Sequence, residues 1–207
     1  MIRLLCFLVL ISCSRLEQLL PPEAAGSDST ISVLLVGNSL TYTNNLPELV
    51  KKEALLFGVE IRTEMLALPN YAIPDHLSDG KLQRLIKKGD FDFVVAQQGP
   101  SSQADGRQML LDTAPVLDEL CKKHGARLAY FMVWPSRQYY QTFDGVIANY
   151  TAAAKSVNVI LCPVGVQWKE VTDTDDFSYY GLDGFHPSQK GSELAAKIIW
   201  ESIHPNN

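Results

Sequence analysis

The sequence lacks the features that nucleic-acid-binding, membrane-spanning and metal-dependent proteins usually show. Its 18 Lys and Arg are outnumbered by 23 Asp and Glu, whereas phosphate binding needs a basic surface. No apolar run after residue 30 is long enough to span a bilayer. The four cysteines show no metal-ligand spacing with histidine, and no glycine-rich phosphate loop is present. We therefore expect neither a nucleic-acid partner nor a metal or other cofactor, and a phosphate-monoester or nucleotide enzyme is a poor candidate.

The 207 residues are 46% apolar and 20% charged, which is the balance of an ordinary globular domain. A chain of this length buries a sufficient core without a disulfide framework. We expect one domain over residues 31–203, followed by a tail over 204–207.

The N-terminal residues have the pattern of an export signal. Arg3 precedes the short apolar run 4–11, which ends in Leu-Ile-Ser-Cys, a sequence that resembles a bacterial lipobox. We expect residues 1–12 to be a signal peptide, Cys13 to carry a lipid, and residues 13–30 to form a tether. Cleavage by ordinary signal peptidase at a nearby small residue is the alternative. Both alternatives predict an extracytoplasmic protein, and the first places it in the periplasm or at the outer membrane, with the lipid as its membrane contact.

Cys121 and Cys162 are the two cysteines that lie inside the expected domain, and both stand among apolar residues. Two buried free thiols are the simpler interpretation. A bridge between them remains an alternative in an oxidising compartment.

Strand-like and helix-like segments alternate along the domain. Short apolar, β-branched runs predict strands at 31–36, 59–68, 91–96, 127–134 and 157–162. Helical spacing predicts helices at 46–57, around 82–86, and at 105–124, 143–156 and 189–203. This alternation predicts an α/β fold with a parallel sheet covered on both faces. Ligands bind such sheets beyond the carboxyl ends of the strands.

A serine stands at one of these strand ends. Gly37-Asn38-Ser39-Leu40-Thr41 follows the first predicted strand. Ser39 would lie exposed on a strand-to-helix turn, where backbone N–H groups can receive an oxyanion. The alternative is that Ser39 only caps the next helix. A serine hydroxyl needs a base to act as a nucleophile.

The candidate base precedes the last predicted helix, in Asp183-Gly184-Phe185-His186-Pro187-Ser188. One loop turn between Asp183 and His186 would let the carboxylate orient the imidazole and stabilise the imidazolium. Taken alone, this pair favours an ordinary surface turn over a catalytic site.

Taken together, the two motifs resemble the SGNH (GDSL-like) hydrolase superfamily. The first block is Gly37-Asn38-Ser39-Leu40, and the last is Asp183-x-x-His186-Pro187. The resemblance covers residues 31–203. It implies a flavodoxin-like three-layer α/β/α fold with a five-stranded parallel sheet. It also implies ester hydrolysis through an acyl-enzyme, with Ser39 as nucleophile, His186 as base and Asp183 as its partner.

Two middle blocks depart from the family pattern. The second block usually supplies a glycine to the oxyanion hole, but Leu68-Pro69-Asn70-Tyr71-Ala72 contains none. Asn70 tolerates the left-handed conformation, so its backbone N–H or its side chain is the expected donor. In the third block, Gln98-Gly99 resembles the Gln-Gly of some carbohydrate-esterase branches, which makes the Gln98 amide a second expected donor. Ser102 stands where the family has asparagine. Gln98 could instead only cap a strand end.

These motifs predict a secreted or lipid-anchored serine esterase that takes a small-molecule or glycan ester, with a short acyl group on a carbohydrate as the first expectation. A lipase or thioesterase would need a long apolar groove, and the sequence has no obvious pattern that predicts one. The alternative from another class is a non-catalytic, glycan-binding surface lipoprotein.

Several other residues near the predicted site have two interpretations. His76 could line the site or make a structural hydrogen bond. Aromatic side chains could stack on a sugar or only pack the loops; they are Trp134, Tyr139, Tyr140, Tyr179 and Tyr180.

Overall fold

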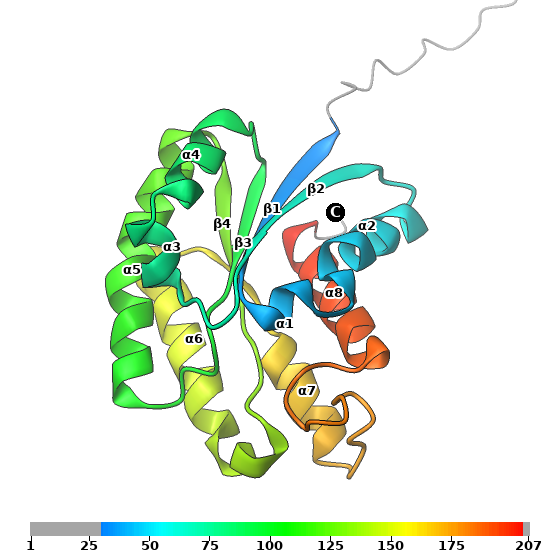
Figure 1. Ribbon diagram of the computed structural model, residues 1–207. Coiled ribbons are helices and arrows are strands. Elements are labelled where there is room, and N and C mark those ends of the chain that lie inside the picture. Colours follow the sequence, from blue (N-terminus) through cyan, green and yellow to red (C-terminus); the bar gives the residue numbers. More distant parts are fainter. Residues whose placement is uncertain (1–29, 205–207) are drawn as a thin grey trace, which may run out of the picture.

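The computed structural model describes residues 30–204 and shows the alternating fold in Figure 1. The predicted signal peptide and all of the tether except residue 30 lie outside these residues. The five strands are β1 (Ile31–Gly37), β2 (Ile61–Ala67), β3 (Phe93–Ala96), β4 (Arg127–Phe131) and β5 (Ile160–Cys162). The helices are α1 (Ser39–Tyr42), α2 (Leu46–Leu56), α3 (Ile73–Ser78), α4 (Lys81–Lys88), α5 (Ala104–Lys123), α6 (Phe143–Val157), α7 (Val164–Thr172) and α8 (Gln189–Ile203). Two 3₁₀ segments cover Thr43–Asn45 and Arg137–Thr142.

All strands pair in parallel, in the order β2-β1-β3-β4-β5. Helices α2 and α8 pack together on one face of the sheet, while α5 and α6 pack together on the other (Figure 1). The chain thus winds away from β1 in both directions, as in doubly wound folds. The three-layer α/β/α fold with a five-stranded parallel sheet is confirmed.

The centre of the sheet forms the densest part of the core. Residues 33–36 of β1 and 94–96 of β3 are almost completely buried, because helices cover both faces of these strands. This explains why their sequences are continuously apolar rather than alternating. β2 lies at an edge and, beyond its buried first residue Ile61, is partly exposed.

The structure differs from the predicted helices and strands in three respects. Met132, Val133 and Trp134 are fully buried but lie beyond the end of β4, so their apolar character reflects packing rather than strand pairing. Residue 157 is the last residue of α6, which is capped by Asn158 in the left-handed conformation. Helices α1, α3 and α7 were not predicted, because at four to nine residues they carry too little periodicity.

Both cysteines of the domain are free and buried, as the simpler interpretation predicted. Burial raises the pKa of each thiol to about 12, so both remain protonated and unreactive. Among the described residues, no helix is long and apolar enough to cross a membrane.

Candidate active site

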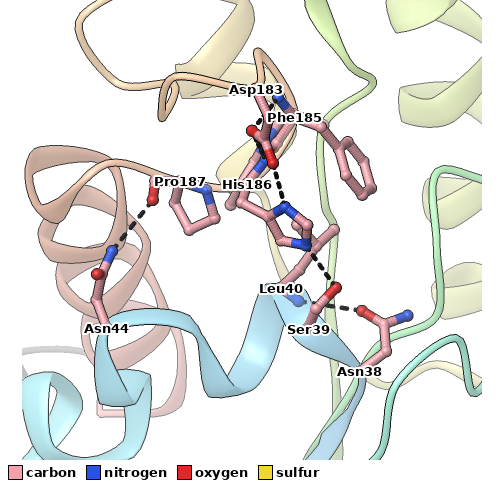
Figure 2. Close-up of polar contacts among 9 residues, drawn as sticks. Asn38, Ser39, Leu40, Asn44, Asp183, Phe185, His186 and Pro187 are labelled. Atoms are coloured by element: carbon pink, nitrogen blue, oxygen red, sulfur yellow. Dashed lines mark hydrogen bonds and ion pairs between the residues drawn. The ribbon is translucent and has the colours of Figure 1, made fainter.

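Ser39 lies at the carboxyl edge of the sheet, on the turn between β1 and α1 (Figure 2). Asn38 caps α1, because its Oδ1 accepts a hydrogen bond from the Leu40 N–H at 3.1 Å. Ser39 is therefore the first residue of the helix and not its cap. Its hydroxyl is left available for another partner.

That partner is His186, which is 147 positions away in the sequence. His186 Nε2 lies 2.9 Å from Ser39 Oγ, and His186 Nδ1 lies 2.5 Å from Asp183 Oδ2 (Figure 2). Because a carboxylate can only accept, Nδ1 carries the proton and Nε2 accepts from the serine hydroxyl. The structure therefore brings the two predicted motifs together as a hydrogen-bonded chain from carboxylate to imidazole to hydroxyl.

Asp183 is fixed by its own loop. Its Oδ1 accepts hydrogen bonds from the backbone N–H groups of Phe185 at 2.9 Å and His186 at 3.0 Å. The hydrogen bond from His186 and the one from Phe185 lower the pKa of Asp183 from its ordinary value. The carboxylate is therefore ionised at neutral pH and can stabilise a protonated His186.

The loop that carries His186 is braced from two sides. Trp134 Nε1 donates to the Phe185 carbonyl at 3.0 Å, and the Trp134 ring stacks on Trp168 with centroids 3.4 Å apart. On the other side, Asn44 Nδ2 donates to the Pro187 carbonyl at 3.1 Å (Figure 2). Trp134 is fully buried, so loop packing, rather than sugar stacking, is its role.

A cavity of about 240 Å³ opens beside Ser39, and the two expected backbone segments line it. Its lining comprises Asn38, Ser39, Asn70, Tyr71, Ala72, Gly99 and Phe185. Asn70 has φ 62°, the left-handed conformation that glycine or asparagine adopts most readily. Within residues 30–204, the backbone N–H groups of Ser39, Asn70 and Gly99 donate no hydrogen bond to a protein acceptor. These three N–H groups are candidate oxyanion donors.

Gln98 needs a correction, because its amide serves another part of the structure. Gln98 Nε2 donates to Ser101 Oγ at 2.7 Å and to the Gly106 carbonyl at 3.3 Å, at the start of α5. The Gln98 backbone is held by the Tyr150 hydroxyl on α6. This buried side chain therefore fastens a turn and is not directed at the Ser39 hydroxyl. Ser102, at the family's asparagine position, lines a different cavity.

The neighbouring Gln97 is the residue that sequence reasoning missed. Its Nε2 donates to Asn38 Oδ1 and to Thr41 Oγ1, both at 2.9 Å, on either side of Ser39 in the serine turn. Gln97 and Gln98 are adjacent residues directly after β3, and only one of the two sends its amide to the serine turn. Pairing of β3 with β1, which the sequence alone does not reveal, decides which one.

His76 makes the structural hydrogen bond that was one of its two interpretations. The ring is fully buried on α3, and Nε2 lies 2.8 Å from the Gly37 carbonyl at the end of β1. Burial lowers the pKa of His76 from its ordinary value, so the neutral ring donates to that carbonyl at neutral pH.

A larger cavity of about 610 Å³ also has Phe185 in its lining. Phe185 and Asp183 belong to its lining, with Pro100, Ser102, Gln103, Pro135, Ser136, Gln138, Tyr139 and Thr142. Phe185 is thus shared by the linings of the two cavities. Tyr139 is exposed here, whereas Tyr180 is buried with its hydroxyl on the Pro135 carbonyl. Among residues 30–204, no cluster of His, Cys, Asp and Glu could hold a metal ion.

Comparison with known proteins agrees with this geometry. The family model of the GDSL-like lipases and acylhydrolases matches residues 41–199, which include Asp183 and His186 and begin two positions after Ser39. No curated protein sequence matches the chain significantly.

Solved structures share the fold over most of the chain. A protein of Slackia heliotrinireducens assigned as an SGNH hydrolase is 25% identical, with a TM-score of 0.72 over 84% of this chain and 100% of that one. The lipase/acylhydrolase of Enterococcus faecalis is 18% identical, with a TM-score of 0.68 over 84% and 95%. The acetylxylan esterase Axe2 of Geobacillus stearothermophilus is 15% identical, with a TM-score of 0.69 over 86% and 96%. The chain belongs to the GDSL-like lipase/acylhydrolase family of SGNH hydrolases.

Proposed function

We propose that this hydrolase is a serine esterase that cleaves carboxylic esters through an acyl-enzyme at Ser39. The observation that carries the proposal is the hydrogen-bonded chain Asp183–His186–Ser39 at the mouth of a cavity lined by free backbone N–H groups. The absence of the family's glycine from the second block favours the alternative, a glycan-binding scaffold without catalysis. Asn70 adopts the left-handed conformation that glycine adopts readily, so the missing glycine does not argue against catalysis.

The geometry supports a two-step reaction. Ser39 Oγ attacks the ester carbonyl carbon while its proton moves to His186 Nε2. The resulting oxyanion is held by the N–H groups of Ser39, Asn70 and Gly99, and Asp183 stabilises the imidazolium. When the tetrahedral intermediate collapses, the alkoxide leaves and takes the proton from Nε2. Water then attacks the acyl-enzyme with His186 again as base, which releases the acid and restores Ser39.

The two cavities suggest where the acyl group and the alcohol part of a substrate bind. The 240 Å³ cavity at Ser39 suits a short acyl group. The 610 Å³ cavity beyond Phe185 presents hydroxyl and amide side chains with exposed Tyr139, a lining that suits a polyhydroxylated alcohol. We propose an acetyl or similar group on a carbohydrate as the substrate. The fold shared with the acetylxylan esterase Axe2 is compatible with this.

The esterase assignment is tested with purified protein and p-nitrophenyl acetate. Ser39→Ala should reduce kcat/KM by at least 10³-fold, because the nucleophile is removed. Ser156→Ala is the matched control, since this exposed serine sits in the last turn of α6 and should keep the wild-type rate. A fluorophosphonate probe should label the wild type and the control but not Ser39→Ala. Equal rates in wild type and Ser39→Ala would refute the proposal.

We also propose that the protein acts outside the cytoplasm, anchored through lipid on Cys13. The support is the sequence of residues 1–13 alone. Expression of the full chain in a bacterium fed labelled palmitate should label the wild type but not Cys13→Ala. A labelled Cys13→Ala variant, or an unlabelled, cleaved wild type, would count against the anchor.

A further inference from the structure

The side chain of Asn38 joins three segments of the candidate site. Its Oδ1 accepts from the Leu40 N–H in the serine turn and from Gln97 Nε2 at the end of β3. Its Nδ2 donates to the Tyr71 carbonyl at 3.0 Å, in the loop that also carries Asn70. The serine turn, the Asn70 loop and the end of β3 are therefore connected through one nearly buried amide.

The backbone decides which way this amide points. The Leu40 N–H needs an acceptor, while the Tyr71 carbonyl needs a donor. The Asn38 amide meets both demands, whereas an ionised carboxylate cannot, because it has no proton to donate. With Oδ1 fixed as an acceptor, Gln97 must present its own Nε2, which also reaches Thr41 Oγ1. Each amide in the pair thus has a single compatible orientation.

Gly37 makes room for this arrangement. A Cβ atom on residue 37 would lie 2.4 Å from Gln97 Nε2 and 2.5 Å from Thr41 Oγ1, well inside van der Waals contact. The absence of a side chain at Gly37 therefore allows the fully buried Gln97 amide to reach the underside of the serine turn.

We propose that Asn38 and Gln97 are positioning residues that hold the Asn70 loop against the serine turn, so that the N–H groups of Ser39 and Asn70 face the same oxyanion. The inference rests on the proposed esterase function. It also predicts that Asp, the residue that the name GDSL places before the serine, cannot replace Asn38 in this chain. A carboxylate there would set an oxygen against the Tyr71 carbonyl oxygen and push the two segments apart.

The first test is Asn38→Asp, which restores the family's Gly-Asp-Ser-Leu. Displacing a catalytic donor by about 1 Å costs on the order of 10²-fold. We therefore expect kcat on p-nitrophenyl acetate to fall roughly 10- to 100-fold, with a smaller change in KM, in a protein that still melts cooperatively.

The second test compares two adjacent buried amides. Gln97→Met and Gln98→Met each remove one amide at the end of β3 with little change in volume, but only Gln97 touches the serine turn. Both should lower Tm, because each leaves buried partners unsatisfied. Gln97→Met should lose at least ten times more kcat than Gln98→Met. The acidic limb of its kcat/KM profile should stay unchanged, because the Asp183–His186–Ser39 contacts remain.

The outcomes separate this inference from the proposed function. Wild type and Ser39→Ala are measured first, and equal rates there would refute the esterase itself. If the wild-type rate depends on Ser39, folded Asn38→Asp or Gln97→Met with wild-type kcat would overturn the positioning role alone. If Asn38→Asp does not fold, the ratio between the two methionine variants decides.

Discussion

The two sides of the candidate site are built in different ways. On the proton-transfer side, the side chains of His186 and Asp183 are 37% and 53% exposed and lie three positions apart in one loop. On the oxyanion side, Asn38 and Gln97 are 7% and 0% exposed and directly follow two different strands, β1 and β3. A base that must exchange protons with water and alcohol needs access to solvent. Donors that stabilise developing charge need a fixed, dry setting, where electrostatic interactions are stronger.

Among changes that leave the Ser39 nucleophile in place, the largest effect should come from breaking the exposed side at Asp183. Asp183→Asn lets the amide present a proton to the ring, which favours the wrong imidazole tautomer. In serine proteases the same change costs about 10⁴-fold. Because the Asp183 side chain is half exposed and screened by solvent, we expect a loss of about 10²- to 10³-fold in kcat/KM. The pKa of Asp183 lies below its ordinary 3.8, so the wild-type carboxylate stays ionised above that pH, and acid weakens its contact only as pH falls through the lowered pKa.

Asp176→Asn is the matched control for that substitution. Asp176 is also an exposed carboxylate, and it pairs with Lys190 and Ser178 rather than with the site. The control should retain the wild-type kcat/KM with p-nitrophenyl acetate. A loss common to both variants would show that Asp183 acts through the fold of the loop, and the contrast between the two sides would fail.

A smaller effect is expected on the oxyanion side, from Asn70. Asn70→Gly keeps the backbone N–H and adopts φ 62° without strain, so kcat should remain within a few-fold of wild type. Asn70→Val disfavours that conformation, because a β-branched residue rarely adopts positive φ. We expect its kcat to fall roughly 10- to 100-fold. If glycine lowers kcat as much as valine does, the donor is the Asn70 side chain rather than its backbone.

The contrast between the two sides also explains what could be predicted from the sequence. The parallel sheet follows from continuous apolar strands that alternate with helices, and each catalytic motif is a short segment beside one element. Asn38 appears in the first motif, but its contacts to Tyr71 and Gln97 depend on three segments meeting at one sheet edge. Local sequence patterns do not show which segments come into contact at that edge. The family resemblance therefore led to Gln98, whereas the amide that binds the serine turn belongs to Gln97.

Phe185 gives a test of specificity at the boundary between the two cavities. Phe185→Ala would join the 240 Å³ cavity at Ser39 to the 610 Å³ cavity beyond it. We expect the ratio of kcat/KM for octanoyl over acetyl p-nitrophenyl esters to rise about 10-fold, because longer acyl chains gain space. The exposed Tyr139→Ala, which opens only the larger cavity, should leave this ratio within two-fold. An unchanged ratio in Phe185→Ala would show that Phe185 does not limit acyl length.

The smallest effect concerns stability, at the buried His76 that supports the end of β1. Burial lowers its pKa below the ordinary 6.5. Above that pH the ring is neutral in both the folded and unfolded states. As pH falls below 6.5, the unfolded chain binds the proton first, so the wild type loses stability until pH passes the folded pKa.

His76→Gln removes this proton linkage while keeping an N–H that can donate to the Gly37 carbonyl. Between pH 7.5 and 5, the unfolding free energy of the wild type should therefore decrease relative to that of the variant, by at most about 1.4 kcal/mol per pH unit. Urea unfolding of both proteins across this pH range measures the difference between their unfolding free energies. The contributions of titratable groups that both chains share cancel in this difference. Parallel pH profiles would mean that the imidazole is protonated as readily in the fold as in the unfolded chain. The Gly37 carbonyl, just before the serine turn, would then accept a hydrogen bond from a charged ring. In that case the buried side of the site would not be dry, and it would not differ from the Asp183 loop in the way described above.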